Sequence, residues 1–151
     1  MASIELIERE LTKSVIGSFY EVYNNLGFGF LEHLHVMALE RELRWKGHRI
    51  NREVSVPVYY KNEILGTQRI DMIVDEKLVV EVKSTRHLPP GSERQVYNYL
   101  RATNLKIGLL LHFGAEAKFY RIVATKVFPV NPPDPLNPPD EVSKPQVHPS
   151  G

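Results

Sequence analysis

The sequence predicts an α/β domain in which a mixed central β-sheet is flanked by helices. Two segments with helical spacing of apolar residues come first, three strand-like segments follow, and a third helix separates these from two further strands. The strand–helix–strand unit over residues 78–112 should make its two strands parallel, whereas the hairpins before it should be antiparallel. A sheet of that kind needs helices to cover it, which predicts the flanking layers.

Three segments have the pattern of helices. Residues 3–26 carry apolar residues at helical spacing, with Ser3 as the expected N-cap and Gly27 after the last turn. Residues 29–46 are predicted to form the second helix. Residues 92–103 form the third, after a Pro-Pro-Gly sequence. The expected apolar face of the second helix consists of Leu31, Leu34, Ala38 and Leu39.

The strand-like segments alternate apolar and polar residues or are continuously apolar. Pro57 lacks a backbone N–H, so the segment that contains it should be an edge strand. The last long apolar run, Ile107–Leu111, has the pattern of a strand buried on both faces. The predicted strands cover residues 49–60, 65–74, 78–83, 106–112 and 119–123.

Composition excludes several classes of protein. Nineteen basic and 18 acidic residues give a formal net charge of +1, so any affinity for nucleic acid must come from local placement of charge. The chain has no cysteine, which excludes disulfides and thiolate zinc sites and fits a cytoplasmic protein. No apolar stretch approaches the roughly 20 residues of a membrane helix, so no membrane association is expected.

The C-terminal segment differs from the rest of the chain. Residues 129–151 contain eight of the 11 prolines and few apolar residues. Such a segment cannot offset its ordering entropy by burial, so we expect one domain over residues 1–128 followed by a Pro-rich disordered tail. The tail is either a simple extension or a docking segment for a protein partner.

Two carboxylates and a lysine are expected to meet on one hairpin. If Asp75–Lys77 forms the turn, Val74 faces Leu78 and Asp71 faces Glu81, and the apolar residues on both strands, Ile70 included, point to the core. A two-residue turn would put core residues outside. Lys83 then lies two residues beyond Glu81 on the same face.

That arrangement is typical of phosphodiester chemistry. Two carboxylates about 5 Å apart repel each other unless a pKa rises or a cation joins them, and a hard divalent cation suits oxygen ligands. A lysine beside them can stabilise negative charge that grows in a transition state. The alternative is an ordinary solvent-facing set of charges in which Lys83 neutralises two acids, because short motifs of this kind are common.

The order of motifs resembles the PD-(D/E)xK nuclease superfamily. Ile70-Asp71 is followed after nine residues by Glu81-Val82-Lys83, and then by a helix that carries Gln95. More narrowly, the chain resembles the GxxExxY protein family over about residues 5–123. The matching stretches are Gly29–Glu32, Glu53–Val58, Asp71–Val74, Glu81–Lys83, Gln95–Thr103 and Lys106–Gly114, and His35 stands where the family pattern has tyrosine.

The resemblance implies a three-layer, restriction-endonuclease-like core and a metal-dependent nuclease site. Asp71 and Glu81 would be ligands of Mg²⁺ or Mn²⁺, with Lys83 as the catalytic lysine. Glu32 would be an additional catalytic acid and metal ligand, and Gln95 a supporting polar residue. A homodimer is a further expectation, because many relatives with this fold cut as pairs.

Several of these residues have simpler interpretations. Glu32 can be an ordinary acid near a helix N-terminus. Ser92 and Gln95 have capping-box spacing, in which the glutamine would bond back to the Ser92 amide. Tyr99 lies one turn after Gln95 and is more typical of a packing residue. Arg86 and Arg94 are candidate nucleic-acid contacts. The basic run Arg41, Arg44, Lys46, Arg49 and Arg52 has the pattern of a solvated charged face.

Three functions therefore stay open. The first is a metal-dependent nuclease that hydrolyses DNA or RNA. The second is a weak or inactive nuclease-fold module that binds nucleic acid, which the balanced net charge favours. The third is a protein-interaction domain that uses the Pro-rich tail. A glycosidase could also use two carboxylates, but the adjacent lysine and the lack of an aromatic sugar platform argue against it.

Overall fold

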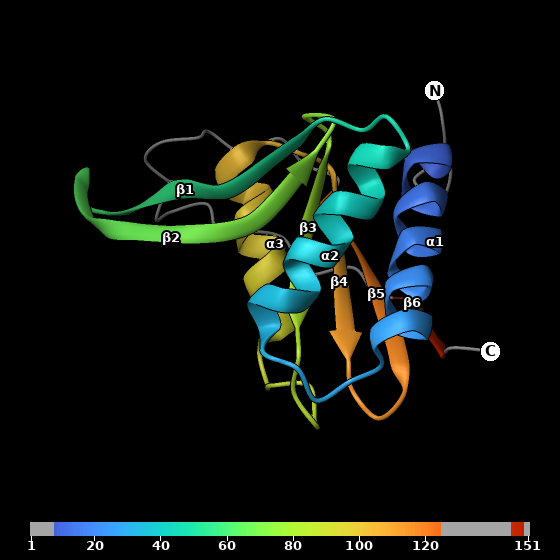
Figure 1. Cartoon of the computed structure of the whole chain (residues 1–151). Helices are drawn as coiled ribbons and strands as arrows, with labels where there is room; N and C mark the ends of the chain where they lie inside the picture. The colour runs from blue at the N-terminus through green and yellow to red at the C-terminus, as the bar shows by residue number, and fades with distance from the viewer. Residues whose placement is uncertain (1–7, 125–145, 150–151) are drawn as a thin grey trace.

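The computed structural model describes residues 8–124 and the backbone of residues 146–149. Two helices come first, three strands follow, and a third helix precedes the last strands (Figure 1), as predicted. The predicted helix start at residue 3 lies outside the described residues. The elements are α1 (Arg9–Leu26), α2 (Glu32–Trp45), β1 (Ile50–Tyr60), β2 (Glu63–Val74), β3 (Leu78–Lys83), α3 (Ser92–Thr103), β4 (Ile107–Phe113), β5 (Ala117–Val123) and β6 (Gln146–Pro149).

The strands form one mixed sheet in the order β1-β2-β3-β4-β5-β6. β3 and β4 are parallel and all other neighbours are antiparallel, as the sequence predicts. β1 is an edge strand, so the prediction from Pro57 is confirmed. β6 pairs with β5 and lies within the segment expected to be disordered. The rest of that segment, residues 129–145 and 150–151, lies outside the described residues.

The sheet separates two apolar cores, which makes the fold three-layered (Figure 1). α1 and α2 pack on one face, over residues such as Val80 and Leu109. α3 packs on the other face, where Val96 and Leu100 contact Val79 and Leu110. None of the helices in residues 8–124 has both the length and the apolar character needed to span a membrane.

The buried face of α2 differs from the prediction. Leu39 is buried as expected, but Leu31 and Leu34 are 68% and 40% exposed. The face that meets the sheet instead contains His35, Leu39 and Leu43, which are four residues apart. The polar character of His35 hid this stripe. The structure allows its burial because both ring nitrogens have hydrogen-bond partners.

The β2–β3 hairpin has the predicted register. Val74 pairs with Leu78 and Met72 with Val80, so the three-residue turn is confirmed. The prediction that Ile70 shares the core face of Met72 is wrong, because Ile70 packs in the core beneath α3. The backbone is irregular at this point: Glu53 has a φ of 51°, and the β1–β2 pairing skips Glu53 and Asp71.

Candidate active site

The site begins where β2 separates from β3. The regular pairing ends at Met72 and Val80, and side chains take over beyond it. The Asp71 amide donates to Oε1 of Glu81 (3.3 Å), and the Val82 amide donates to Oδ2 of Asp71 (2.8 Å). The two acids are therefore brought together as predicted, but they bridge a gap between the strands instead of standing as a regular cross-strand pair.

Burial sets the electrostatics of this acid pair. Glu81 is only 4% exposed. Desolvation, and then repulsion from Asp71, raises the pKa of Glu81 to about 8. Desolvation also raises the pKa of Asp71, although the Val82 amide and the charge of Lys83 oppose the shift. The pair therefore retains a proton near neutral pH, which shows that the donors around it do not compensate two negative charges.

Lys83 and Glu32 complete the group from two other directions. The Nζ atom of Lys83 lies 3.4 Å from Oε2 of Glu81, and the lysine side chain is 18% exposed. Glu32, in the first turn of α2, accepts a hydrogen bond from the Ser84 amide at 3.3 Å. Burial and repulsion from Asp71 raise the pKa of Glu32, while Lys83 and the Ser84 amide oppose the rise. The four predicted charged residues thus form one connected group, in which Glu32 interacts with Asp71 and Lys83, and these two interact with Glu81.

Gln95 reaches the acids through Tyr99. The capping-box interpretation is wrong: Gly91 caps α3, no side chain caps it, and the Ser92 hydroxyl donates to the Pro89 carbonyl. Gln95 instead hydrogen-bonds to Tyr99.

Tyr99 has the packing role that the sequence suggests, and it also lies near the acids. Its hydroxyl donates to the Arg69 carbonyl at 3.2 Å, and it is 2% exposed. Burial and the nearby charges of Glu81 and Asp71 raise the pKa of Tyr99. Tyr99 packs in the core beneath α3, and its position one helical turn after Gln95 also brings it within electrostatic reach of the acids.

His35 also belongs to this region and was not predicted as a site residue. Its ring stacks on Phe113 with centroids 4.0 Å apart, and its nitrogens contact the Ser84 hydroxyl (2.7 Å) and the Gly27 carbonyl (3.0 Å). Burial lowers the pKa of His35, so the neutral ring donates from Nε2 to Gly27 and accepts at Nδ1 from Ser84. His35 therefore ties the residue after Lys83 to α2.

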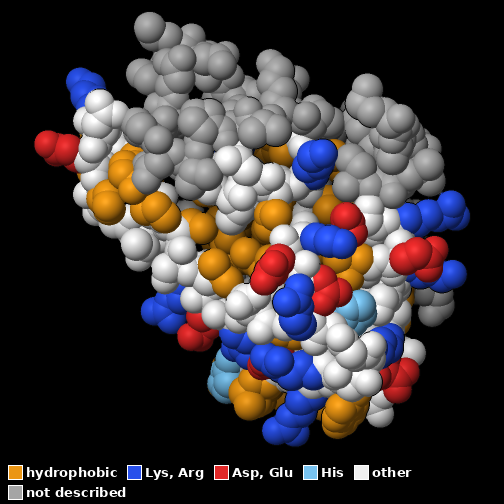
Figure 2. Space-filling model, turned by 90° about the horizontal axis from the view of Figure 1, so that it is seen from above, with side chains coloured by type: hydrophobic (Ala, Val, Ile, Leu, Met, Phe, Trp, Pro, Cys, Tyr) orange, Lys and Arg blue, Asp and Glu red, His pale blue; other side chains and the backbone are white. Residues whose placement is uncertain are grey.

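The basic residues fall into separate groups. Arg86 lines a cavity beyond the end of β3, and the exposed Arg94 stacks over Tyr97 with its guanidinium carbon 4.9 Å from the ring centroid. In the basic run, Arg44 and Arg52 both bind Glu40, and Arg49 pairs with Glu76. Figure 2 shows basic and acidic side chains intermingled on the face seen from above. These pairs favour the solvated-face interpretation of the run.

The donor set can be tested against a divalent cation. Asp71, which is half-buried, and Glu81, which is buried, supply hard carboxylate oxygens in a position that is short of positive charge. Among the side chains of residues 8–124, no three His, Asp or Glu residues are gathered closely enough to form a complete ligand cluster. Mg²⁺ is commonly bound by one or two carboxylates, with water and substrate phosphate as the other ligands, so the residues present fit this cation.

Comparison with protein families agrees with this geometry. The model of the PD-(D/E)XK nuclease superfamily matches residues 9–122. The chain belongs to the PD-(D/E)XK nuclease superfamily. No curated protein and no solved structure gives a significant match. Superfamily membership and the observed layers establish a restriction-endonuclease-like α/β core, and they suggest a nuclease function with an associated interaction with nucleic acid.

Proposed function

We propose that this protein is a metal-dependent nuclease that hydrolyses phosphodiester bonds in DNA or RNA. The observation that carries the proposal is the acid pair at the separation of β2 from β3, with an ammonium group beside it. Asp71 and Glu81 lie in hydrogen-bond contact, and Lys83 is 3.4 Å from Glu81. Glu81 is buried beside Asp71 without enough hydrogen-bond donors to compensate both charges. A bound cation would therefore relieve unfavourable charge at this position.

Each side chain has a role in the proposed reaction. Asp71 and Glu81 would hold Mg²⁺ or Mn²⁺, and Glu32, which is not gathered with them into a cluster of three ligands, would act on the site as an additional acid from α2. When bound, the cation would supply polarisation of a phosphoryl oxygen and a lowered pKa of water. Lys83 would stabilise negative charge on the phosphate and orient a water molecule. Tyr99 and Gln95 position the acid side of the site from α3.

The narrower features of the proposal extend beyond superfamily membership. The motif series from Gly29 to Gly114 supports placing the chain in the GxxExxY family. Arg86 and Arg94 are proposed as phosphate contacts. A homodimer, a cytoplasmic location and docking of a protein partner through residues 129–151 also stay predictions.

A nuclease assay tests the proposal. Full-length protein is incubated with single- and double-stranded DNA and RNA in Mg²⁺, in Mn²⁺ and in excess chelator. Cleavage should require the metal and should be lost in Lys83→Ala and Glu81→Ala. Lys77→Ala is the matched control, because its exposed side chain lies in the turn at the opposite end of the hairpin. Cleavage that persists in both site variants would contradict the assignment.

The second candidate is a nuclease-fold module that binds nucleic acid without efficient cleavage. The net charge of +1 favours it, because nucleases that hold long duplexes usually have a more basic surface. Salt-dependent binding without turnover in any divalent metal would support this alternative over the enzyme.

A further inference from the structure

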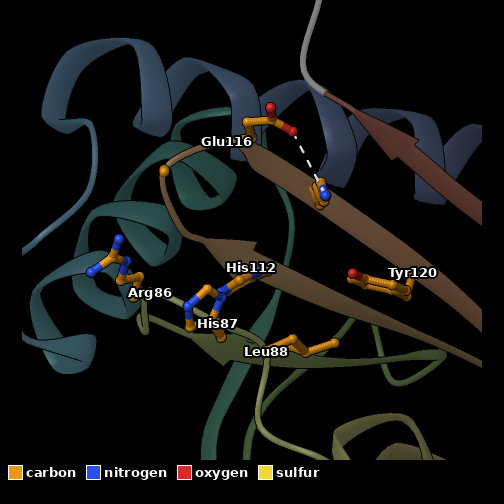
Figure 3. A pocket seen from close by; sticks show the side chains of 8 residues that line it. Arg86, His87, Leu88, His112, Glu116 and Tyr120 are labelled. Carbon is orange, nitrogen blue, oxygen red and sulfur yellow. Dashed lines mark ion pairs between the residues drawn. The ribbon is translucent and has the colours of Figure 1, made fainter.

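A cavity of about 410 Å³ opens just beyond the C-terminal end of β3. Arg86, His87 and Leu88 line it from the segment after β3, and Glu116 and Tyr120 line it from the β4–β5 hairpin (Figure 3). Lys118, from β5, also lines it. His112 of β4 and Ala115 complete the lining. We call this cavity the β5 pocket. Its residues, apart from Arg86, have no part in the proposed cleavage centre.

The β5 pocket is next to Lys83 on the same side of the sheet. Lys83 pairs with His112 in the parallel β3–β4 ladder, so their strands are one strand spacing, ~4.8 Å, apart. Val82 and Leu111, the residues before them, both face the core beneath α1 and α2. Lys83 and His112 therefore face the α3 side together.

The charge of the β5 pocket is mainly positive. Arg86 and Lys118 are formal cations, His87 is exposed beside them, and Glu116 is the acid among the lining residues. Glu116 pairs with Lys118 at 3.6 Å, but the two side chains are 67% and 39% exposed. An exposed pair of this kind contributes little and exchanges easily for another anion. The pocket therefore has two cations available for an incoming phosphate.

The ring of His112 lines the pocket and is held in one position by its neighbours. Its Nε2 atom donates to the Thr85 carbonyl at 2.7 Å, and a Cβ atom added at Gly114 would lie only 2.8 Å from its ring. Burial lowers the pKa of His112, and the positive charges of Lys118 and His87 lower it further. Those two charges therefore act on the same small volume. The hydroxyl of Tyr120 points towards His112 (Figure 3) and adds a donor without charge.

We infer that the β5 pocket binds a backbone phosphate of the nucleic-acid strand being cut, on the side of the scissile phosphate that lies towards β5. Arg86 and Lys118 supply the charge, and His87 and Tyr120 supply hydrogen bonds. The inference rests on the proposed nuclease function and adds a direction to it: the strand runs from the acid pair across β4 to the β4–β5 hairpin. Backbone phosphates are the groups that position a strand on a protein, which is the role assigned here.

Binding measurements test this path independently of cleavage. Labelled single-stranded DNA and RNA without terminal phosphates are titrated with full-length protein, in Ca²⁺ to prevent turnover, at several salt concentrations. The double variant Arg86→Ala/Lys118→Ala should bind roughly tenfold more weakly and lose about 0.7 from the slope of log K against log salt, because the contact with one phosphate is removed. Arg49→Ala/Lys77→Ala removes the same charge from exposed positions elsewhere and should change the affinity less than about twofold.

The outcomes separate the inference from the proposed function. Equal weakening in both double variants would overturn the inference, since only net charge would then matter. Unchanged affinity in the pocket variant, with cleavage intact in Mg²⁺, would overturn the assignment of phosphate binding to the β5 pocket but would still support the nuclease function. Weaker binding in the pocket variant alone, with no cleavage by the wild type, would support phosphate binding in the β5 pocket and contradict the nuclease function. A pocket effect confined to oligonucleotides with a terminal phosphate would overturn the assignment to an internal phosphate.

Discussion

The two ends of the β2–β3 hairpin use the same residue type in opposite ways. At the turn, the Asp75 carboxylate accepts hydrogen bonds from the Arg49 amide (2.8 Å) and from Nδ1 of His48 (2.7 Å). These donors and the nearby positive charges lower the pKa of Asp75 despite partial burial. At the far end, burial prevails over the available donors, and the pKa values of Asp71 and Glu81 rise. Donor supply, not residue type, distinguishes a structural acid from a candidate site.

The turn end also shows how little a hydrogen-bond pattern proves by itself. Ser14 contacts Nε2 of His48 at 2.7 Å, so serine, histidine and Asp75 are bonded in the order of a hydrolase triad. Ser14 lies within α1, where the neighbouring backbone amides are used by the helix and cannot stabilise a developing oxyanion. The three residues instead connect α1, the segment before β1 and the β2–β3 turn.

The largest expected difference between the two ends is in cleavage. Lys83→Ala should lower kcat by about 100-fold or more, because a positioned charge next to the reacting phosphate is lost. Ser14→Ala should leave kcat unchanged, since we assign the turn end a structural role. Steady-state assays in Mg²⁺ measure both. A comparable loss of kcat in Ser14→Ala would place the catalytic centre at the turn end of the hairpin and contradict the assignment to Asp71, Glu81 and Lys83.

The pH dependence of stability should have opposite signs at the two ends. The folded protein holds a proton on Glu81 between pH 4.5 and about 8 that the unfolded chain releases, so stability falls as pH rises through that window. Glu81→Gln should therefore be more stable than the wild type above pH 8, by on the order of 2–4 kcal/mol, and the gain should vanish below pH 4.5. Denaturant unfolding in excess chelator measures this difference.

Asp75→Asn should destabilise the protein by about 1–3 kcal/mol at pH 7, because a charged acceptor of two hydrogen bonds is lost. The pKa of Asp75 is depressed in the fold, so its contribution is present above pH 3.8 and is lost as pH falls through the folded value. Unfolding at pH 7 and at pH 3 tests this sign. If Asp75→Asn is as stable as the wild type at pH 7, the structural role assigned to the Asp75 carboxylate is contradicted.

The smallest expected effect on stability and kcat is at Ser84, which follows β3 and contacts His35 and Glu32 of α2. Ser84→Ala leaves Nδ1 of the buried His35 without its donor, which should cost about 1 kcal/mol of stability. Its backbone amide still donates to Glu32, so kcat should change little. Thermal unfolding and a cleavage assay on the same sample measure both. A large fall in kcat would show that the hydroxyl itself acts in the reaction.

The sequence predicts the hairpin well because a binary pattern determines it. Core residues such as Met72 and Val80 admit one parity, and that parity brings Asp71 to Glu81. The pattern does not reveal that the two strands separate beyond Met72, where Glu53 has a positive φ and Ile70 packs in the core beneath α3. The predicted regular pair thus becomes a pair bridged through side chains.

Polar residues account for the other differences. His35 is buried because two distant groups, Gly27 and Ser84, satisfy its ring, and no local pattern reports such partners. Ser92 and Gln95 have capping-box spacing, but the left-handed Gly91 already starts the helix with a φ of 84°. Hydrogen bonds to residues distant in sequence and local backbone geometry determine the environments of these polar residues. The periodicity of apolar residues predicts only where the helices and strands lie.

The most direct test of the central claim is to locate a bound cation. Crystals of the full-length protein are soaked in Mn²⁺, and anomalous scattering is recorded for the wild type and for Glu81→Gln. We predict a peak between the carboxylates of Asp71 and Glu81 that weakens or disappears in the variant. A saturating soak that leaves this position without a peak, or that places manganese at Asp75 instead, would contradict the account.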